Sequence, residues 1–326
     1  MARKRRASLL VALAHPDDEI FHGGVLAHLS DRGARVTLVC ATDGEAGKPH
    51  SSVGPVDDLG ALRVEELRRS CARLGIEEPV LLRFHDSARK ERQRHDDPHA
   101  LANVDMLDVE AALRGIIADM RPHVVLTFEP HGSYYHPDHV AIHRATTAAF
   151  FASGVMGPEA PERLFYTAML REVFLGFADA SRGRGIIDGL DPDLFSTTPE
   201  MLAVTFDARP YLERKLSALT AHQSAFGVTP ELLKNPGPAA AHMTRPRTSR
   251  AVVSSRSSRI RCSRDPPFNR GRSHPRKRPM RLRASATWVS NTGQRAGRAR
   301  PRIVPRRREN LTPQCLPTRS WWITTS

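Results

Sequence analysis

Two short polar clusters carry the residue types best suited to metal-assisted hydrolysis. The first runs from His15 to Glu19 and reads His-Pro-Asp-Asp-Glu. His15 and Asp18 are both metal-binding types, and their close spacing allows one turn to present both to a single ion. Asp17 lies between them and is a candidate base. A zinc hydrolase takes about three ligands from the protein and leaves one position open for water, so a third ligand must come from elsewhere in the chain.

The second cluster runs from Tyr134 to His139 and reads Tyr-Tyr-His-Pro-Asp-His. His139 is the natural third ligand and completes a His-Asp-His set with the first cluster. His143 competes with it, because residues four apart share one face of a helix and such a histidine pair binds zinc in some hydrolases.

Short apolar runs precede both clusters and are expected to position them. Residues 8–14 and 123–128 read as buried strands, and Pro16 ends the ladder pairing of the first. The carboxyl ends of parallel strands share one edge of a sheet, so the two clusters can meet there. The sequence predicts an α/β fold, Rossmann-like, with three layers α/β/α and a mostly parallel sheet. Its further strands are expected at 35–41, 80–84, 163–168 and 204–207, and its helices at 19–32, 59–74, 106–120, 140–151 and 211–225.

With these paired motifs the sequence resembles the LmbE/PIG-L family of zinc-dependent deacetylases, which act on N-acetylglucosamine conjugates. The resemblance covers roughly residues 7–226. It implies one zinc ion per chain at His15, Asp18 and His139, with iron(II) as the alternative metal, and it favours His139 over His143.

The resemblance also implies roles around the metal. Asp17 would be the general base on the metal-activated water, and Tyr134 would help to polarise the carbonyl. His136 would stabilise the oxyanion or protonate the leaving amine, with Asp138 orienting it.

Substrate contacts are expected from two further positions. Arg63 and Glu66 resemble the family's Arg-x-x-Glu, whose arginine points into the site and binds substrate hydroxyls; an exposed arginine paired with a neighbour three residues away fits the pattern equally well. Asp86 follows the strand at 80–84 and is a candidate substrate contact. His222 either reaches the pocket or lies at a helix end near the negative pole of the dipole.

The charge of the chain is divided unevenly. The 326 residues carry a formal charge of +14, but residues 236–326 hold 22 basic and two acidic residues, whereas residues 1–235 hold 27 basic and 33 acidic ones. We therefore expect a mildly acidic deacetylase domain over 1–235 and a separate tail over 236–326. The tail is rich in Arg, Ser and Pro, and its composition is typical of disorder. It resembles an out-of-frame reading of a GC-rich gene, with a nucleic-acid-binding or membrane-surface arm as the alternative.

Other features restrict the cellular setting. The four cysteines form no close pair, which argues against a disulfide framework and a cysteine-rich zinc site. The basic residues at 4–6 before an apolar run mimic a signal peptide, but that run is short and leads directly into the proposed ligands. No stretch is long and apolar enough for a membrane span. We expect a cytoplasmic protein; the sequence specifies no oligomeric state.

The leading hypothesis is a zinc-dependent hydrolase that removes the N-acetyl group from a glucosamine-containing small molecule. One alternative is a zinc amidase that cleaves a larger acyl group, for instance from a mycothiol S-conjugate. Another, of a different class, is a polyanion-binding protein that acts through its basic tail. A magnesium protein built on Asp17 and Asp18 is disfavoured, because histidines are poor ligands for Mg²⁺.

Overall fold

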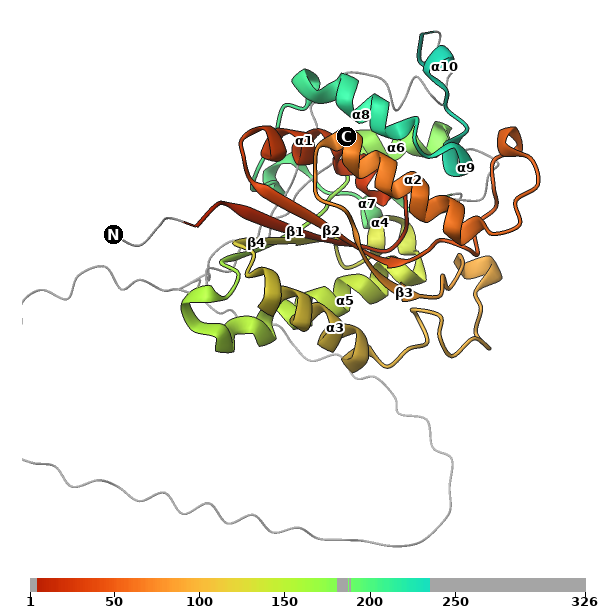
Figure 1. The fold of residues 1–326 in the computed structure, drawn as a ribbon. Coiled ribbons are helices and arrows are strands. Elements are labelled where there is room, and N and C mark those ends of the chain that lie inside the picture. The colour runs from red at the N-terminus through yellow and green to blue at the C-terminus, as the bar shows by residue number, and fades with distance from the viewer. Residues whose placement is uncertain (1–4, 181–186, 188, 235–326) are drawn as a thin grey trace, which may run out of the picture. The chain divides into compact units, whose positions relative to one another are not determined.

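Five parallel strands form the centre of the fold (Figure 1). The structure is a computed structural model, and it describes residues 5–180, 187 and 189–234. The strand order is β3-β2-β1-β4-β5, so the chain progresses to one side of β1 and then returns to its other side. The strands are β1 (Ser8–Leu13), β2 (Arg35–Thr42), β3 (Val80–Phe84), β4 (Val124–Thr127) and β5 (Arg163–Tyr166).

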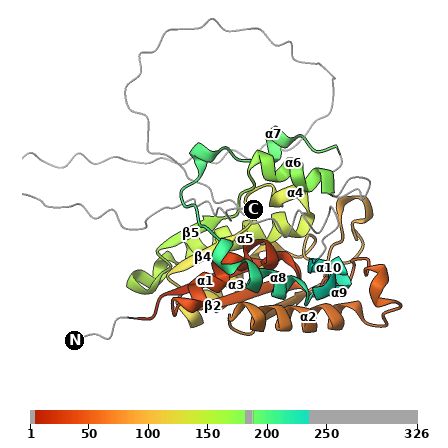
Figure 2. The ribbon, with the colours of Figure 1, turned by 90° about the horizontal axis from the view of Figure 1, so that it is seen from above.

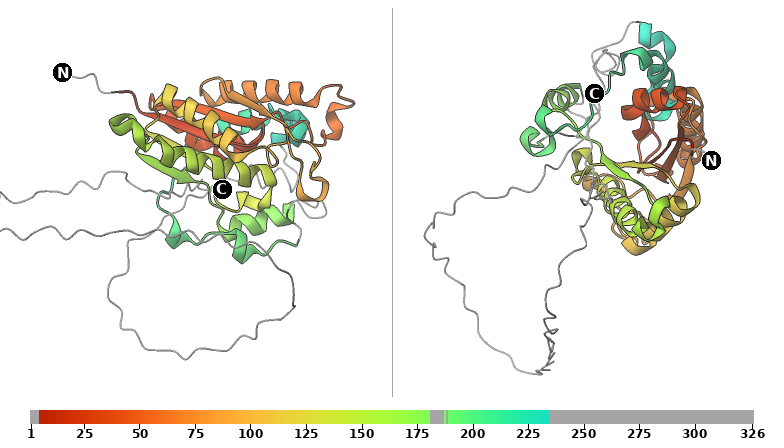
Figure 3. Two further views of the ribbon diagram at one scale, coloured as in Figure 1. Left: turned by 90° about the horizontal axis from the view of Figure 1, so that it is seen from below. Right: turned by 90° about the vertical axis from the view of Figure 1, so that its left-hand side faces the viewer.

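Helices cover both faces of the sheet (Figures 1 and 2). One layer contains α1 (Gly23–Asp31), α2 (Leu59–Leu74) and α8 (Leu212–Leu219), and the other contains α3 (Met106–Met120) and α5 (Pro137–Ala152). Figure 3 shows the same layers from two other sides. The other helices are α6 (Arg171–Ala180) and the short α4 (Gly132–Tyr135), α7 (Pro192–Phe195), α9 (Gln223–Phe226) and α10 (Pro230–Lys234). There are also 3-10 helices: η1 (Asp18–His22), η2 (Ser51–Val53), η3 (Lys90–Arg92), η4 (Ser153–Glu159), η5 (Pro199–Met201) and η6 (Arg209–Tyr211).

Burial of β1 on both faces explains why its sequence carries no charge. Leu10, Val11 and Ala12 are completely buried between the two helix layers. Strands of a parallel sheet are covered on both sides and therefore read as continuous apolar runs rather than alternating ones. The predicted three-layer α/β fold is confirmed, and the sheet of the described residues is entirely parallel.

Local signals fix the ends of the helices that flank the site. The Asp58 side chain accepts a hydrogen bond from the Ala61 N–H at 2.9 Å, and Gly75 ends α2 at φ 74°, so the predicted bounds 59–74 are confirmed. The helix expected at 140–151 begins earlier, at Pro137, because proline suits the first turn and the His136 side chain caps it.

Two expected elements are wrong and one is altered. Residues 204–207 are no strand, since they pair with no other strand among the described residues. The helix expected at 211–225 is broken into α8 and α9, and His222 lies at the break. The helix expected at 19–32 begins as the 3-10 helix η1 before α1.

The proposed tail over 236–326 lies outside the described residues, so the expected division into two regions stays a prediction. Among the residues that are described, none of the helices combines the length and the hydrophobicity needed to cross a bilayer.

Candidate active site

The two His-Pro-Asp clusters meet where the strand order reverses. β1 and β4 are neighbours in register, with Ala12 opposite Thr127, and each cluster follows one of them. In open α/β sheets this switch point is where ligands bind, because the loops leave the two strands in opposite directions. The sequence prediction that both clusters share one sheet edge is confirmed.

Three of the predicted ligands are buried in mutual contact. His15 Nδ1 lies 3.1 Å from His139 Nε2. The Asp18 carboxylate approaches both histidines with different oxygens: Oδ2 lies 3.5 Å from His15 Nδ1 and Oδ1 lies 3.4 Å from His139 Nε2. Ligands of one tetrahedral zinc ion are about 3.3 Å apart, because each is about 2 Å from the metal. The donor set therefore has the chemistry and spacing that one such ion requires.

His136 joins this cluster as a further potential metal ligand. Its ring meets the His15 ring edge-on at 4.5 Å between centroids and stacks on the His139 ring at 5.0 Å. Potential metal ligands form two overlapping groups, one of His15, His136 and His139, and one of His15, Asp86, His136 and Asp138. Asp18 is in neither group, although its two oxygens lie near His15 and His139. The site thus holds more donors than the three that a catalytic zinc ion takes from a protein.

Hydrogen bonds hold the two histidines that the sequence predicts as metal ligands. Asp138 Oδ2 lies 3.1 Å from His15 Nε2 and accepts a hydrogen bond from the Ser87 N–H at 2.9 Å. His139 Nδ1 is 3.1 Å from the Gly132 carbonyl oxygen. In metal sites such outer partners fix the tautomer of the histidine and direct its other nitrogen at the ion.

Asp138 therefore orients His15 rather than the residue expected from the sequence, His136. The Asp138 carboxylate lies 4.0 Å from His136 Nδ1, beyond hydrogen-bonding distance. That nitrogen instead accepts the Asp138 backbone N–H at 3.2 Å, because His136 is the N-cap of α5. A neutral imidazole that accepts at Nδ1 carries its proton on Nε2, so His136 offers a donor at Nε2.

Asp17 has an unusual backbone that a neighbouring carboxylate supports. Its φ of 122° is a conformation that residues with a side chain rarely adopt. The Asp17 N–H donates to Glu19 Oε2 at 3.1 Å. Glu19 is itself completely buried, and its Oε1 is bonded by His222 Nε2 at 2.6 Å and by the Ser70 hydroxyl at 2.5 Å.

Asp17 and Asp18 have very different pKa values because their surroundings differ. Burial and the nearby Asp18 charge raise the pKa of Asp17 to about 7. Burial also opposes ionisation of Asp18, but His139 and His15 outweigh it and hold the pKa of Asp18 well below its usual range. A base acts best when its pKa is near the working pH, so Asp17 is suited to proton transfer and Asp18 to binding a cation.

A strained turn between β4 and α5 presents Tyr134 to the cluster. Gly132, Ser133 and Tyr135 all have φ near +60°, and the Glu129 carboxylate accepts from two backbone N–H groups of this turn. The Tyr134 ring lies 5.1 Å from the His139 ring. Burial raises the pKa of Tyr134, so its hydroxyl stays protonated and can donate a hydrogen bond.

The two predicted substrate-binding residues are both buried. Arg63 is not an exposed helix charge: it packs over the glycines of the loop after β2 and donates to the Gly44 carbonyl at 3.0 Å, while its Nε has no hydrogen-bond partner among the described residues. Asp86 lies 3.7 Å from His15 Nε2 and is 4% exposed. Its contact with His15 places it in the polar cluster itself.

His222 and His143, whose roles the sequence left open, have defined places, as do two further histidines, His22 and His131. His222 pairs with Glu19 rather than reaching a pocket. His143 donates to the Phe128 carbonyl at 2.7 Å, and the Phe128 ring stacks on His139 at 4.0 Å. His22 is buried at the end of η1, and His131 lines a cavity beside the site.

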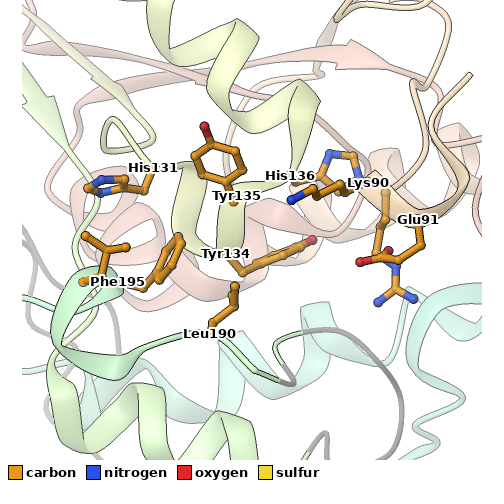
Figure 4. Close-up of a pocket in the computed structure, with 10 residues that line it drawn as sticks. Lys90, Glu91, His131, Tyr134, Tyr135, His136, Leu190 and Phe195 are labelled. Carbon is orange, nitrogen blue, oxygen red and sulfur yellow. The ribbon is translucent and has the colours of Figure 1, made fainter. Parts of the chain in front are cut away.

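That cavity of about 560 Å³ opens beside Tyr134 and His136 (Figure 4). Segments far apart in the sequence form its walls, from η3, from the turn before α5 and from α7 with the residue Leu190 before it. His136 and Tyr134 line it, so a ligand in this cavity would lie against the edge of the polar cluster.

Sequence reasoning missed the support of the site by Glu19 and Glu129. Glu19 is the last residue of the first motif and Glu129 follows β4, but both act on backbone groups of strained turns. The only sign of this role in the sequence is that each carboxylate lies close to a turn. That sign is weak.

Comparison with known proteins gives one family match and many relatives. Residues 10–150 match the family model PIG-L, described as GlcNAc-PI de-N-acetylase. The chain is 34% identical over 238 residues to a 1D-myo-inositol 2-acetamido-2-deoxy-alpha-D-glucopyranoside deacetylase of Acidothermus cellulolyticus, covering 68% of this chain and 80% of that one. It is 35% identical over 243 residues to the enzyme of the same name from Rhodococcus opacus, covering 68% and 82%. Among solved structures, N,N'-diacetylchitobiose deacetylase from Pyrococcus horikoshii matches with 22% identity and a TM-score of 0.46, covering 70% of this chain and 73% of that one.

Proposed function

The chain belongs to the PIG-L family of de-N-acetylases, and from this premise we propose that it removes the acetyl group from a small N-acetylglucosamine conjugate with the help of one zinc ion. The spacing of 3.1–3.5 Å among His15, Asp18 and His139, beside a carboxylate suited to proton transfer, is the observation that carries this proposal.

His15, Asp18 and His139 would hold the metal. Two nitrogens and one carboxylate form a common zinc donor set, and iron(II) is the alternative metal. A bound zinc ion lowers the pKa of a coordinated water and polarises the carbonyl of the amide. Asp138 keeps His15 in the tautomer that directs Nδ1 toward the ion, and Asp86 adds negative charge on the same side.

Asp17 acts as the general base in this proposal. Its strained backbone and the Glu19 contact hold its carboxyl group beside the ligand Asp18. It accepts the proton of the attacking water, which a base with a pKa of about 7 does efficiently near neutral pH. As the C–N bond breaks, the leaving amine takes a proton from Asp17 or from His136 Nε2.

Tyr134 and His136 stabilise the negative charge that develops on the carbonyl oxygen. Both keep a proton to donate: Tyr134 on its hydroxyl and neutral His136 on Nε2. Burial and the neighbouring His15 and His139 keep the pKa of His136 well below its usual value, which favours the neutral form. Donors aimed at an oxyanion in a water-poor site typically contribute about 10²–10³-fold each. Arg63, buried next to the loop after β2, would bind hydroxyl groups of the substrate.

The test uses the full chain and the substrate class of its relatives. Purified protein loaded with Zn²⁺ is incubated with 1-O-(2-acetamido-2-deoxy-α-D-glucopyranosyl)-myo-inositol, and released acetate is measured. We expect hydrolysis that stops on removal of the metal by a chelator and returns with added Zn²⁺. The Asp17→Asn variant should bind the metal and hydrolyse far more slowly. Hydrolysis that is unaffected by the chelator would contradict the proposal.

The polyanion-binding alternative places the function in residues 236–326. Deleting them separates the two hypotheses: the enzyme hypothesis predicts that hydrolysis is retained, and the binding hypothesis predicts that the only function is lost.

A further inference from the structure

The cavity beside the site is much larger than an acetyl group requires. Its volume of about 560 Å³ is in the range of pockets that enclose whole ligands of moderate size. Tyr134 and His136, the proposed oxyanion donors, lie on its inner side. Whatever is attached to the scissile amide or to its sugar must therefore extend into this space.

The two sides of the cavity differ in character (Figure 4). Phe195 lies on one side, and Leu190 lies nearer the middle, next to Tyr134; Leu194, the neighbour of Phe195 in α7, also lines the cavity. On the opposite side lie Lys90 and Glu91, and the preceding residue Arg89 also lines the cavity. These two cationic groups and one carboxylate offer hydrogen-bond donors and an acceptor to sugar hydroxyls. Leu194 is 57% exposed, so its side chain is available for contact with a ligand. Apolar surface exposed at the rim of a pocket is stabilised by an apolar ligand group.

The apolar side is held by specific contacts. The Phe195 ring lies 6.5 Å from the buried Phe174 ring of α6, nearly parallel to it. Asp193 of α7 pairs with Arg171 at 2.6 Å, and the Thr197 N–H donates to the Met169 carbonyl at 2.7 Å. These contacts anchor both ends of α7, so Leu194 and Phe195 are presented on a supported segment.

We propose that this site is selective for glucosamine conjugates that carry an apolar group, which packs against Leu194 and Phe195 while the sugar faces Lys90 and Glu91. The proposal rests on the proposed function and extends it to a class of substrate. The apolar group has two chemical sources: an aglycone on the sugar or an N-acyl chain longer than acetyl.

Three synthetic substrates distinguish these sources. The reference is the methyl α-glycoside of N-acetylglucosamine. The benzyl α-glycoside of N-acetylglucosamine adds an apolar aglycone, and the methyl α-glycoside of N-hexanoylglucosamine adds an apolar acyl chain. Release of free amine gives kcat/KM for each. We expect kcat/KM of one of the two apolar substrates to exceed that of the reference by about tenfold or more. This is the gain in binding that one apolar group packed on an aromatic ring typically gives.

Variants test whether Leu194 and Phe195 cause the preference for apolar substrates. Phe195→Ala should reduce the ratio of kcat/KM between the preferred substrate and the reference by about tenfold. Leu194→Ser is a second variant that is safer for folding, because that side chain is largely exposed. The control is Val155→Ala, an exposed apolar residue of η4 outside the cavity, which should leave the ratio unchanged. Equal kcat/KM for all three substrates, or equal ratios in the Phe195 and Val155 variants, would overturn the inference and leave the deacetylase function standing.

A binding measurement tests the inference without turnover. Calorimetry compares benzyl α-glucosaminide with methyl α-glucosaminide and, in a second pair, free hexanoate with acetate. Tighter binding of the benzyl or the hexanoyl compound, weakened in Phe195→Ala, supports the apolar surface even if no substrate is hydrolysed. If the metal-loaded protein hydrolyses none of the substrates, the proposed function is contradicted and the inference is not. If binding shows no preference for the apolar compounds, the inference is contradicted and the proposed function is not.

Discussion

Removing the His222 side chain should both destabilise the fold and disturb Asp17, the proposed catalytic base. His222 and Glu19 are both completely buried and lie 2.6 Å apart. Breaking a buried ion pair by deleting one partner costs about 3–5 kcal/mol, because the other charge stays buried. Glu19 would keep the Ser70 hydroxyl and the Asp17 N–H, so His222→Ala should fall near the lower end, at about 3 kcal/mol.

The catalytic effect has a separate physical origin. The Asp17 backbone at φ 122° is an unfavourable conformation that costs on the order of 1–3 kcal/mol and persists only while its surroundings hold it. Glu19, once it has lost His222, holds the Asp17 N–H less rigidly. We expect kcat to fall more than KM rises, with the metal still bound.

The assay combines urea unfolding of the full chain with kinetics and metal analysis. His99→Ala, an exposed histidine away from the cluster, is the matched control and should change stability by less than about 0.5 kcal/mol. A double-mutant cycle with Glu19→Gln should give a coupling of about 1–3 kcal/mol. A His222→Ala variant with the stability and kcat of the His99 control would refute the reasoning.

The same pair gives a pH dependence of definite sign. Burial alone would lower the pKa of His222, but the Glu19 charge and hydrogen bond outweigh it and raise the pKa above its ordinary value. A raised pKa in the folded state means that folding favours the protonated form. This stabilisation is complete below the unfolded value of about 6.5 and is lost as the pH rises through the folded value. The stability difference between wild type and His222→Ala should therefore shrink over that window; a difference that grows would contradict the assignment.

Three further predictions concern residues around the proposed metal site. Asp138→Asn should weaken zinc affinity by about 10- to 100-fold, measured by competition with a chelator; unchanged affinity would show that its contact with His15 does not support the ligand. Asp17→Asn should retain the metal and lose at least about 10²-fold in kcat, and full turnover would exclude it as the base. Gly132→Ala should lower both stability and metal content, because a Cβ there would lie 2.6 Å from His139 Cβ and the backbone has a φ of +58°. The control in thermal unfolding is Gly115→Ala, because Gly115 has open space around it. Equal losses in the two variants would contradict this prediction.

Local patterns in the sequence determine the elements that the prediction placed correctly. The uncharged run of β1 and the capped, amphipathic helix α2 carry their own signals, and both have close to the predicted bounds. The pairing of the two His-Pro-Asp clusters also follows from the sequence, since each comes after a buried strand of one parallel sheet.

Long-range contacts determine what the prediction missed. Residues 204–207 have strand-like composition, but a strand forms only where another strand offers hydrogen bonds. Asp138 has His136 as its neighbour in sequence and His15 as its neighbour in space, and only the three-dimensional arrangement decides between them. Likewise, His222 finds Glu19 across 203 residues, a distance that no motif spans.

Metal content tests the central claim most directly. Elemental analysis of the full chain, purified from cells grown with zinc and iron, is compared with the Asp18→Ala variant. We predict about one zinc or iron ion per folded wild-type chain and a loss of that ion in the variant, because Asp18 contacts both histidine ligands. A folded wild type without bound metal, or a variant that retains the full amount, would contradict the account of this site as a metal-dependent deacetylase.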